Sequence, residues 1–222
     1  MVAVGFCKPT ATDTRTGSVS GTSYHPAMKR LGLRALIIII AGCSTAQRPT
    51  AEHTEPRTPA PLAAGRVVLG AFSMATPATW GVKPVTSSMR VADYVLPAPA
   101  GEEAELVVYY FGASGAGSID ANLDRWFGQF TQPDGRATRD VAKIEHVQLA
   151  GQDATLVSVA GHYHAAAMPG GDEVVDKPDQ ALLAAIVASP SGPYFFKLVG
   201  AKTTIDANAA SFRAMLSSLQ LR

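Results

Sequence analysis

Two histidines separated by one residue are the best metal-binding candidate in this sequence. His162 and His164 lie in an alternating apolar segment that predicts a β-strand, and residues two apart in a strand point to the same face. Both imidazoles could therefore bind one metal ion, with further ligands from the loop over residues 165–178. This pattern supports a metal-binding or hydrolytic protein as one hypothesis. The alternative is a pair of surface histidines at a strand end, because His-x-His alone is a weak signal.

Lys197 and Trp80 are the candidate binding residues. Lys197 interrupts the apolar segment 194–199, and a buried lysine is costly unless a partner neutralises it. We expect a salt bridge to a helix carboxylate such as Asp120 or Asp124. The alternatives are a position at the sheet margin and a role as a cation that faces a ligand. Trp80 lies in a predicted loop, where an exposed Trp would mark a contact surface.

No set of residues in the sequence matches a known catalytic arrangement. The turn over residues 112–117 lacks the glycine frame of a phosphate-binding loop, which favours a flexible connection. Ser114 and Ser158 have no G-x-S-x-G context, and the acidic pairs at 102–103 and 172–173 are typical of solvated loops. We therefore predict no cofactor and no enzymatic activity.

Cys43 has surroundings that predict a covalent modification. It follows a short apolar run, residues 31–41, which the basic stretch Met28-Lys29-Arg30 precedes. This order is typical of a secretory signal peptide, and the run is too short to span a bilayer. The segment Ile40-Ala41-Gly42-Cys43 resembles the lipobox of bacterial lipoproteins. The resemblance implies cleavage before Cys43, a diacylglycerol on its thiol and an acyl chain on its new amine.

The lipobox predicts a lipid-anchored protein of the cell envelope. One acyl chain holds a protein only marginally on a membrane, whereas two or more hold it firmly, so the modified Cys43 would be a sufficient anchor. Ser44 follows the cysteine, and this residue is compatible with the outer membrane of a Gram-negative cell, facing the periplasm. Residues 1–27 precede the signal, and we interpret them as a disordered or wrongly assigned extension ahead of a start at Met28.

Composition limits the class of protein. The chain has 222 residues, 47% of them hydrophobic, and carries 19 Lys and Arg against 18 Asp and Glu. The apolar fraction excludes an intrinsically disordered protein, and the balanced charge argues against a nucleic-acid partner bound through a basic surface. From Cys43 onward the chain has 14 basic and 17 acidic residues, a net charge of −3. We expect a signal peptide over 28–42, a proline-rich tether over 43–65 and one globular domain over 66–222.

The periodicity of the domain predicts strands and two helices. Two hairpins are expected, the first from strands 141–149 and 153–163 and the second from strands 181–188 and 193–199. Apolar stripes at helical spacing predict one helix after Ser118 and another from about Thr204. Several strands have two apolar faces, so the sequence predicts an α+β fold. In that fold helices flank both faces of an antiparallel sheet, as an α/β/α sandwich.

Four segments carry a family resemblance, which extends over residues 66–221. They are SMRVADY at Ser88–Tyr94, AELVVYYFG at Ala104–Gly112, WFGQF at Trp126–Phe130 and GPYFFKLVG at Gly192–Gly200. Together they resemble a group of bacterial proteins, many of them lipoproteins, with the PsbP-like fold shared by PsbP and the Mog-type proteins. The resemblance implies an α/β/α sandwich and a role as an accessory or partner-binding factor, with no catalytic residue. We therefore expect a non-enzymatic envelope lipoprotein that binds a protein partner or a ligand, or a passive structural lipoprotein.

Overall fold

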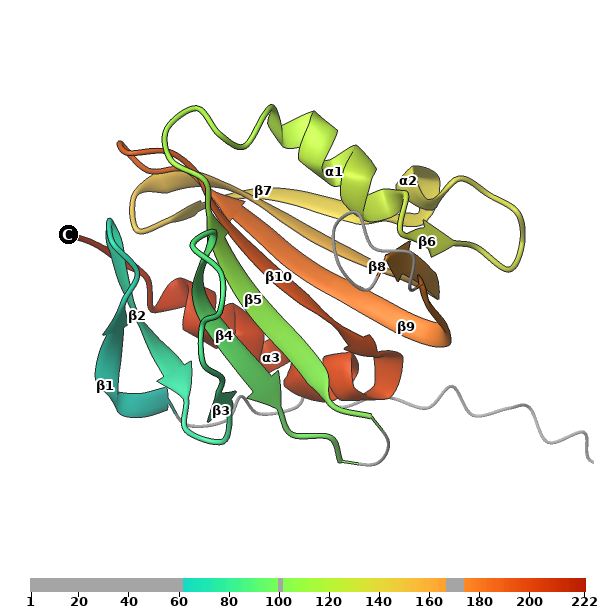
Figure 1. Ribbon diagram of the computed structural model, residues 1–222, viewed down its shortest axis with the longest axis horizontal. Helices are drawn as coiled ribbons and strands as arrows, with labels where there is room; N and C mark the ends of the chain where they lie inside the picture. The colour runs from blue at the N-terminus through green and yellow to red at the C-terminus, as the bar shows by residue number, and fades with distance from the viewer. Residues whose placement is uncertain (1–61, 100–101, 167–173) are drawn as a thin grey trace, which may run out of the picture. The chain divides into compact units, whose positions relative to one another are not determined.

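The computed structural model describes residues 62–99, 102–166 and 174–222, which form two antiparallel β-sheets and three helices (Figure 1). The strands are β1 (Leu62–Val68), β2 (Phe72–Pro77), β3 (Gly81–Val82), β4 (Arg90–Leu96), β5 (Ala104–Tyr110), β6 (Phe130–Thr131), β7 (Lys143–Leu149), β8 (Gln152–Ala166), β9 (Val174–Val187), β10 (Tyr194–Ala201) and β11 (Gln220–Leu221). The helices are α1 (Ile119–Phe127), α2 (Thr138–Val141) and α3 (Lys202–Ser217).

The large sheet has the strand order β3-β4-β5-β10-β9-β8-β6, and β7 also pairs with β8. The turn between β7 and β8 consists of Ala150 and Gly151, whose φ angles are both positive at 52° and 73°. Such turns match the twist of the flanking strands, so this predicted hairpin is confirmed. The second predicted hairpin is also confirmed, with β9 and β10 joined after Val187 and before Tyr194.

The small sheet joins the two ends of the described chain in the order β1-β2-β11. The guanidinium of Arg66 on β1 donates hydrogen bonds to the carbonyl oxygen of Ser73 at 2.8 Å and to that of Ser218 at 2.7 Å. These bonds connect the first hairpin to the end of α3. Strand β1 starts at Leu62, which lies inside the segment expected to be a tether.

Each of the two longer helices buries one apolar stripe against the large sheet, on opposite faces (Figure 1). On α3 the stripe includes Phe212 and Met215, which pack with β2, β9 and β10. On α1 it includes Leu123 and Trp126, which cluster with Phe195 of β10. The Oγ atom of Ser118 accepts a hydrogen bond from the N–H of Ala121 at 3.1 Å, so the N-cap expected for α1 is present. The helix predicted near the C-terminus is α3.

The predicted α/β/α sandwich is wrong, because the described residues are mostly β. Helix α1 has nine residues and α2 has four, so neither forms a layer over the eight-stranded sheet. Helix α1 ends at Phe127, where Gly128 caps it, and the chain then enters the short strand β6. The apolar stripe had extended the expected helix to Phe130, which instead lies buried on β6.

The predicted loop over residues 165–178 is wrong for the residues that the structure describes. Residues 165–166 belong to β8 and residues 174–178 belong to β9. Strands β8 and β9 have 15 and 14 residues and pair as far as Ala166 and Val174. Some polar side chains of this part face each other across the ladder, as His164 faces Asp176. Within the residues that the structure describes, no helix combines the length and apolar character needed to cross a bilayer.

Candidate binding face

The two candidate metal ligands do converge, as their spacing predicted. His162 Nε2 is hydrogen-bonded to Asp176 Oδ1, and His164 Nδ1 lies 3.7 Å from Asp176 Oδ2. The pair with His162 lowers the pKa of Asp176 below its ordinary value. Asp176 was missed because it faces His164 only through the strand register. Among the described residues no group of three or more His, Cys, Asp or Glu side chains is placed to hold a metal ion, so the metal site stays a prediction.

Trp80 does not form the exposed surface that its loop position suggested. It is 6% exposed, and its indole Nε1 donates a hydrogen bond to Asn208 Oδ1 on α3 at 3.1 Å. Its ring also packs against Tyr94, with the centroids 6.4 Å apart. The short strand β3 that follows Trp80 pairs with β4, which turns the indole into the core. The expected exposure of Trp80 is therefore wrong.

Lys197 lies half-buried on the α1 side of the large sheet. Its Nζ donates a hydrogen bond to the side-chain Oε1 of Gln129, just beyond α1, at 2.7 Å. The expected salt bridge to α1 is wrong, because Arg139 binds Asp124 at 2.7 Å and also lies 3.6 Å from Asp120. Burial lowers the pKa of Lys197 to about 8, and the negative charge of Glu105 opposes this change.

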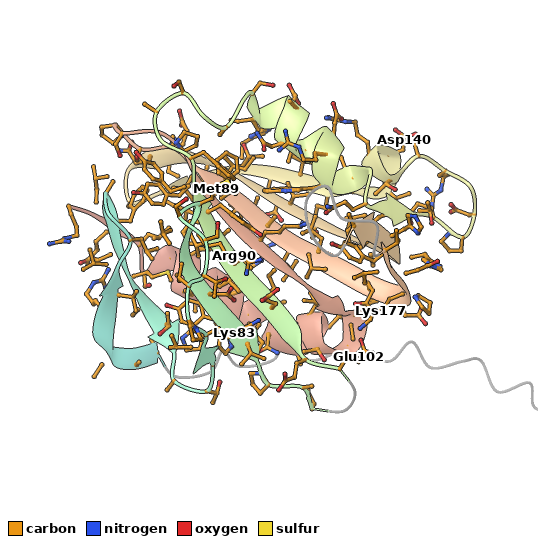
Figure 2. All side chains as sticks on the ribbon, viewed as in Figure 1. Lys83, Met89, Arg90, Glu102, Asp140 and Lys177 are labelled. Atoms are coloured by element: carbon orange, nitrogen blue, oxygen red, sulfur yellow. The ribbon has the colours of Figure 1, made fainter. Side chains whose placement is uncertain are left out.

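A cluster of four charged side chains lies beside Lys197. Arg90 Nη1 is 2.5 Å from Asp93 Oδ2 and 3.7 Å from Glu105 Oε1, and Glu105 also forms an ion pair with Lys83. Asp93 is only 3% exposed, and its second carboxylate oxygen has no hydrogen-bond partner among the described residues. Burial therefore raises the pKa of Asp93, while the hydrogen bond from Arg90 counteracts the rise. Figure 2 shows Arg90 and Lys83 along the β4 side of the sheet.

The register of three strands brings these charges together. Val107 of β5 lies opposite Asp93 on β4 and opposite Lys197 on β10, so the three side chains form one row on one face. Tyr109, two residues along β5, lies under the guanidinium of Arg90 at 5.8 Å. A register shift between Arg90 and Ala92 turns Arg90 toward this face, and no pattern in the sequence indicates that shift.

We call this region the open face. It consists of Lys83, Arg90, Asp93, Glu105, Val107, Tyr109, Lys197 and Val199, of which Tyr109 and Val199 also pack against the core cluster under α1. Figure 1 shows that α1 crosses one end of the sheet and leaves the neighbouring parts of β4, β5 and β10 uncovered by any described helix. The side chains of Arg90 and Glu105 are 30% and 42% exposed, whereas Asp93 and Val107 beside them are 3% and 5% exposed. The sequence pointed to this face only through Lys197.

Cys43 and the lipobox lie outside the described residues, as do Met168, Asp172 and Glu173 of the expected loop. Their sequence-based assignments therefore stay predictions. The described part of the chain starts at Leu62, after most of the expected tether.

The comparisons with known proteins yield structural neighbours and no family. No family model and no curated protein matches the chain. The solution structure of cyanobacterial PsbP from Synechocystis sp. PCC 6803 is 14% identical, with a TM-score of 0.42, and the match covers 68% of this chain and 87% of that chain. The Pseudomonas aeruginosa protein PA94, described as of unknown function, is 13% identical with a TM-score of 0.39, over 71% of this chain and 96% of that chain.

A third solved structure, from Bacteroides thetaiotaomicron VPI-5482, is 13% identical with a TM-score of 0.35, and the match covers 68% of this chain and 45% of that chain. A PsbP protein is thus among the structural neighbours, in line with the PsbP-like part of the sequence resemblance. The lipoprotein part of the resemblance is not tested by these comparisons. All three TM-scores are below 0.5, so we base no functional argument on these neighbours.

Proposed function

We propose that this protein is a non-enzymatic binding module of the cell envelope, anchored through a lipid on Cys43, and that a protein partner docks on the open face. The observation that carries the proposal is the presence of charged side chains on a sheet face that none of the described helices covers. Asp93, Glu105 and Lys197 alternate there with apolar residues. Asp93 is buried and Lys197 is half-buried, and removing charges from water is costly, so packing alone does not explain their position.

The chemistry of the open face resembles that of a protein interface. Tyr and Arg are enriched among the residues that contribute most to protein–protein binding, and here Tyr109 and Arg90 lie in contact at its centre. Small ligands prefer concave sites, and two clefts among the described residues lie away from the open face. One, of about 730 Å³, is lined by residues of α1 and β7 that include Leu123 and His146. Another, of about 400 Å³, lies beside His162.

Site-specific photo-crosslinking of the full chain in its own cell tests the docking surface. Benzoylphenylalanine would replace Val199 or, as a second position in case the first variant fails to fold, Tyr109. The same group at Lys143, which is exposed on β7, is the matched control. We expect one adduct of defined mass from the open-face positions and none from the control. Equal adducts at both places, or none at either open-face position, would contradict the proposal.

The lipid anchor is tested separately by Cys43→Ala. The substitution removes the thiol that would carry diacylglycerol, so we expect complete loss of labelling by radioactive palmitate and release of the protein from the membrane fraction. Ser44→Ala keeps the cysteine and is the control for an effect on export. Unchanged labelling of the Cys43→Ala protein would rule out the anchor without affecting the docking surface.

A second function, metal binding, has one observation in its favour, the convergence of His162 and His164 on Asp176. Titration of the full chain with zinc, compared with the His162→Ala variant, tests it. Heat of binding that disappears in the variant would support a metal site, and identical traces would exclude one at these residues.

A further inference from the structure

Lys197 is a cation whose hydrogen-bonding capacity is only partly used. A lysine ammonium has three N–H donors, and the acceptor described for Lys197 is the neutral amide oxygen of Gln129 at 2.7 Å. No carboxylate among the described residues forms an ion pair with it. The residues opposite Lys197 on the two neighbouring strands, Val107 and Ala184, are apolar and buried. Their side chains therefore offer the ammonium no further hydrogen-bond acceptor.

The two carboxylates of the open face already have their own cations. Asp93 is held by Arg90, and Glu105 is held by Lys83 and lies within 4 Å of Arg90. These groups together have three positive charges against two negative charges when Lys197 is counted. The excess positive charge is on Lys197, which is the member without a carboxylate. The open face therefore has a net positive charge of one at this lysine, and one anionic group placed there would complement it.

We infer that Lys197 receives a carboxylate of an acidic side chain presented by the protein partner. This inference rests on the proposed docking function and names the chemistry that the partner must bring. The half-buried ammonium would lose its remaining water when the partner covers the face, and an incoming carboxylate would replace that water with a charge-assisted hydrogen bond. Because a covered site has a lower dielectric, the pair would also select against partners with an apolar or basic residue at that point.

The inference has a direct probe in a pair of peptides, hexaglutamate and hexaglutamine, which differ in charge and match in length. The full chain carrying Cys43→Ser, labelled with ¹⁵N-lysine, would be titrated with each peptide while the side-chain ammonium resonances are recorded. We expect hexaglutamate to shift the Lys197 resonance saturably, hexaglutamine to leave it unchanged, and the Lys143 resonance to respond to neither. No shift at Lys197, or equal shifts from both peptides, would overturn the inference.

Substitutions of the lysine supply the second readout. Lys197→Met should weaken hexaglutamate binding about ten-fold, the effect of one charge-assisted contact. Lys197→Arg retains the charge and should retain most of the binding. Lys143→Met removes the same charge from an exposed site already paired with Glu145 and should leave binding unchanged. Equal losses of hexaglutamate affinity in Lys197→Met and Lys143→Met would show that binding depends only on the net charge of the protein, and would overturn the inference.

The crosslinking experiment separates the inference from the proposed function. If the adduct from position 199 disappears with Lys197→Glu and returns when an acidic residue of the crosslinked partner segment is changed to Lys, the carboxylate pair is established. If the adduct persists unchanged in Lys197→Glu, the inference fails while the docking surface stands. If neither position 199 nor position 109 gives an adduct specific to the open face, the proposed function itself fails.

Discussion

The two ends of one sheet face differ sharply in chemistry. Under α1, Phe195 is 2% exposed and its ring meets Trp126 edge-on, with the centroids 6.3 Å apart. Four residues further along β10, on the same face, Val199 is half-buried, and Lys197 between them has an amide as its described partner. The same strand therefore supports a closed core at one end and the charged open face at the other. The α1 end is thus packed as core, whereas the other end combines partly buried residues that still touch this core, such as Val199, with the charged side chain of Lys197.

The largest effect should come from the closed end. Phe195→Ala removes a buried ring beneath α1 and should lower the free energy of unfolding by about 3–5 kcal/mol. Val199→Ala, on the same strand and face, should cost less than about 1 kcal/mol because its side chain is only half-buried. Urea denaturation followed by far-UV circular dichroism measures both. Similar losses for the two variants would mean that the open end is packed like a core.

An intermediate effect should come from the ion cluster of the open face. Arg90→Ala leaves the buried carboxylate of Asp93 without its cation, and we expect a loss of about 2 kcal/mol, reduced from a fully buried pair because Arg90 is 30% exposed. Asp93→Asn added to Arg90→Ala should recover part of that loss, since the unpaired charge is then gone. Strict additivity of the two substitutions in a double-mutant cycle would show that Arg90 and Asp93 do not interact.

The smallest effect has the opposite sign. Lys197→Met replaces a partly desolvated cation by an apolar side chain, so it should raise the free energy of unfolding by about 1 kcal/mol at pH 7 while weakening binding. Burial depresses the pKa of Lys197 to about 8 in the folded chain, against an ordinary value of 10.5. The folded chain thus binds fewer protons than the unfolded chain between these values, and wild-type stability should rise with pH there.

The advantage of Lys197→Met should therefore shrink as the pH increases from 8 toward 10.5. Denaturation curves of both proteins across this range measure the difference. A constant difference would show that Lys197 has the same pKa in the folded and unfolded chains. Lys143→Met, at an exposed lysine, is the control and should show no such pH dependence.

The sequence predicted local structure well where one short-range signal decides the conformation. Gly151 at the tip of the β7–β8 turn and Ser118 at the start of α1 are such signals, and both act as expected. The sequence-based predictions were wrong where pairing between distant segments decides the conformation. The polar segment at the start of β9 forms a strand because β8 supplies its partners, and the length of α1 is limited by the pairing of Phe130 with Tyr163.

The same division applies to the candidate site. Lys197 was recognisable as a charge within an apolar strand, but its partner Gln129 and its lack of a described carboxylate depend on where α1 ends. Arg90 and Glu105 become neighbours only through the β4–β5 register and its irregularity. Such contacts join residues far apart in the chain, and no periodic pattern within either segment encodes them.

We propose that a partner covers the open face in the cell. Trace acetylation of lysines, followed by peptide mass spectrometry, tests this directly by comparing native membranes with the purified full chain. We expect Lys197 to react readily in the purified protein and to be strongly protected in native membranes, while Lys143 reacts equally in both. Equal reactivity of Lys197 in the two preparations would contradict the claim that a partner occupies this face.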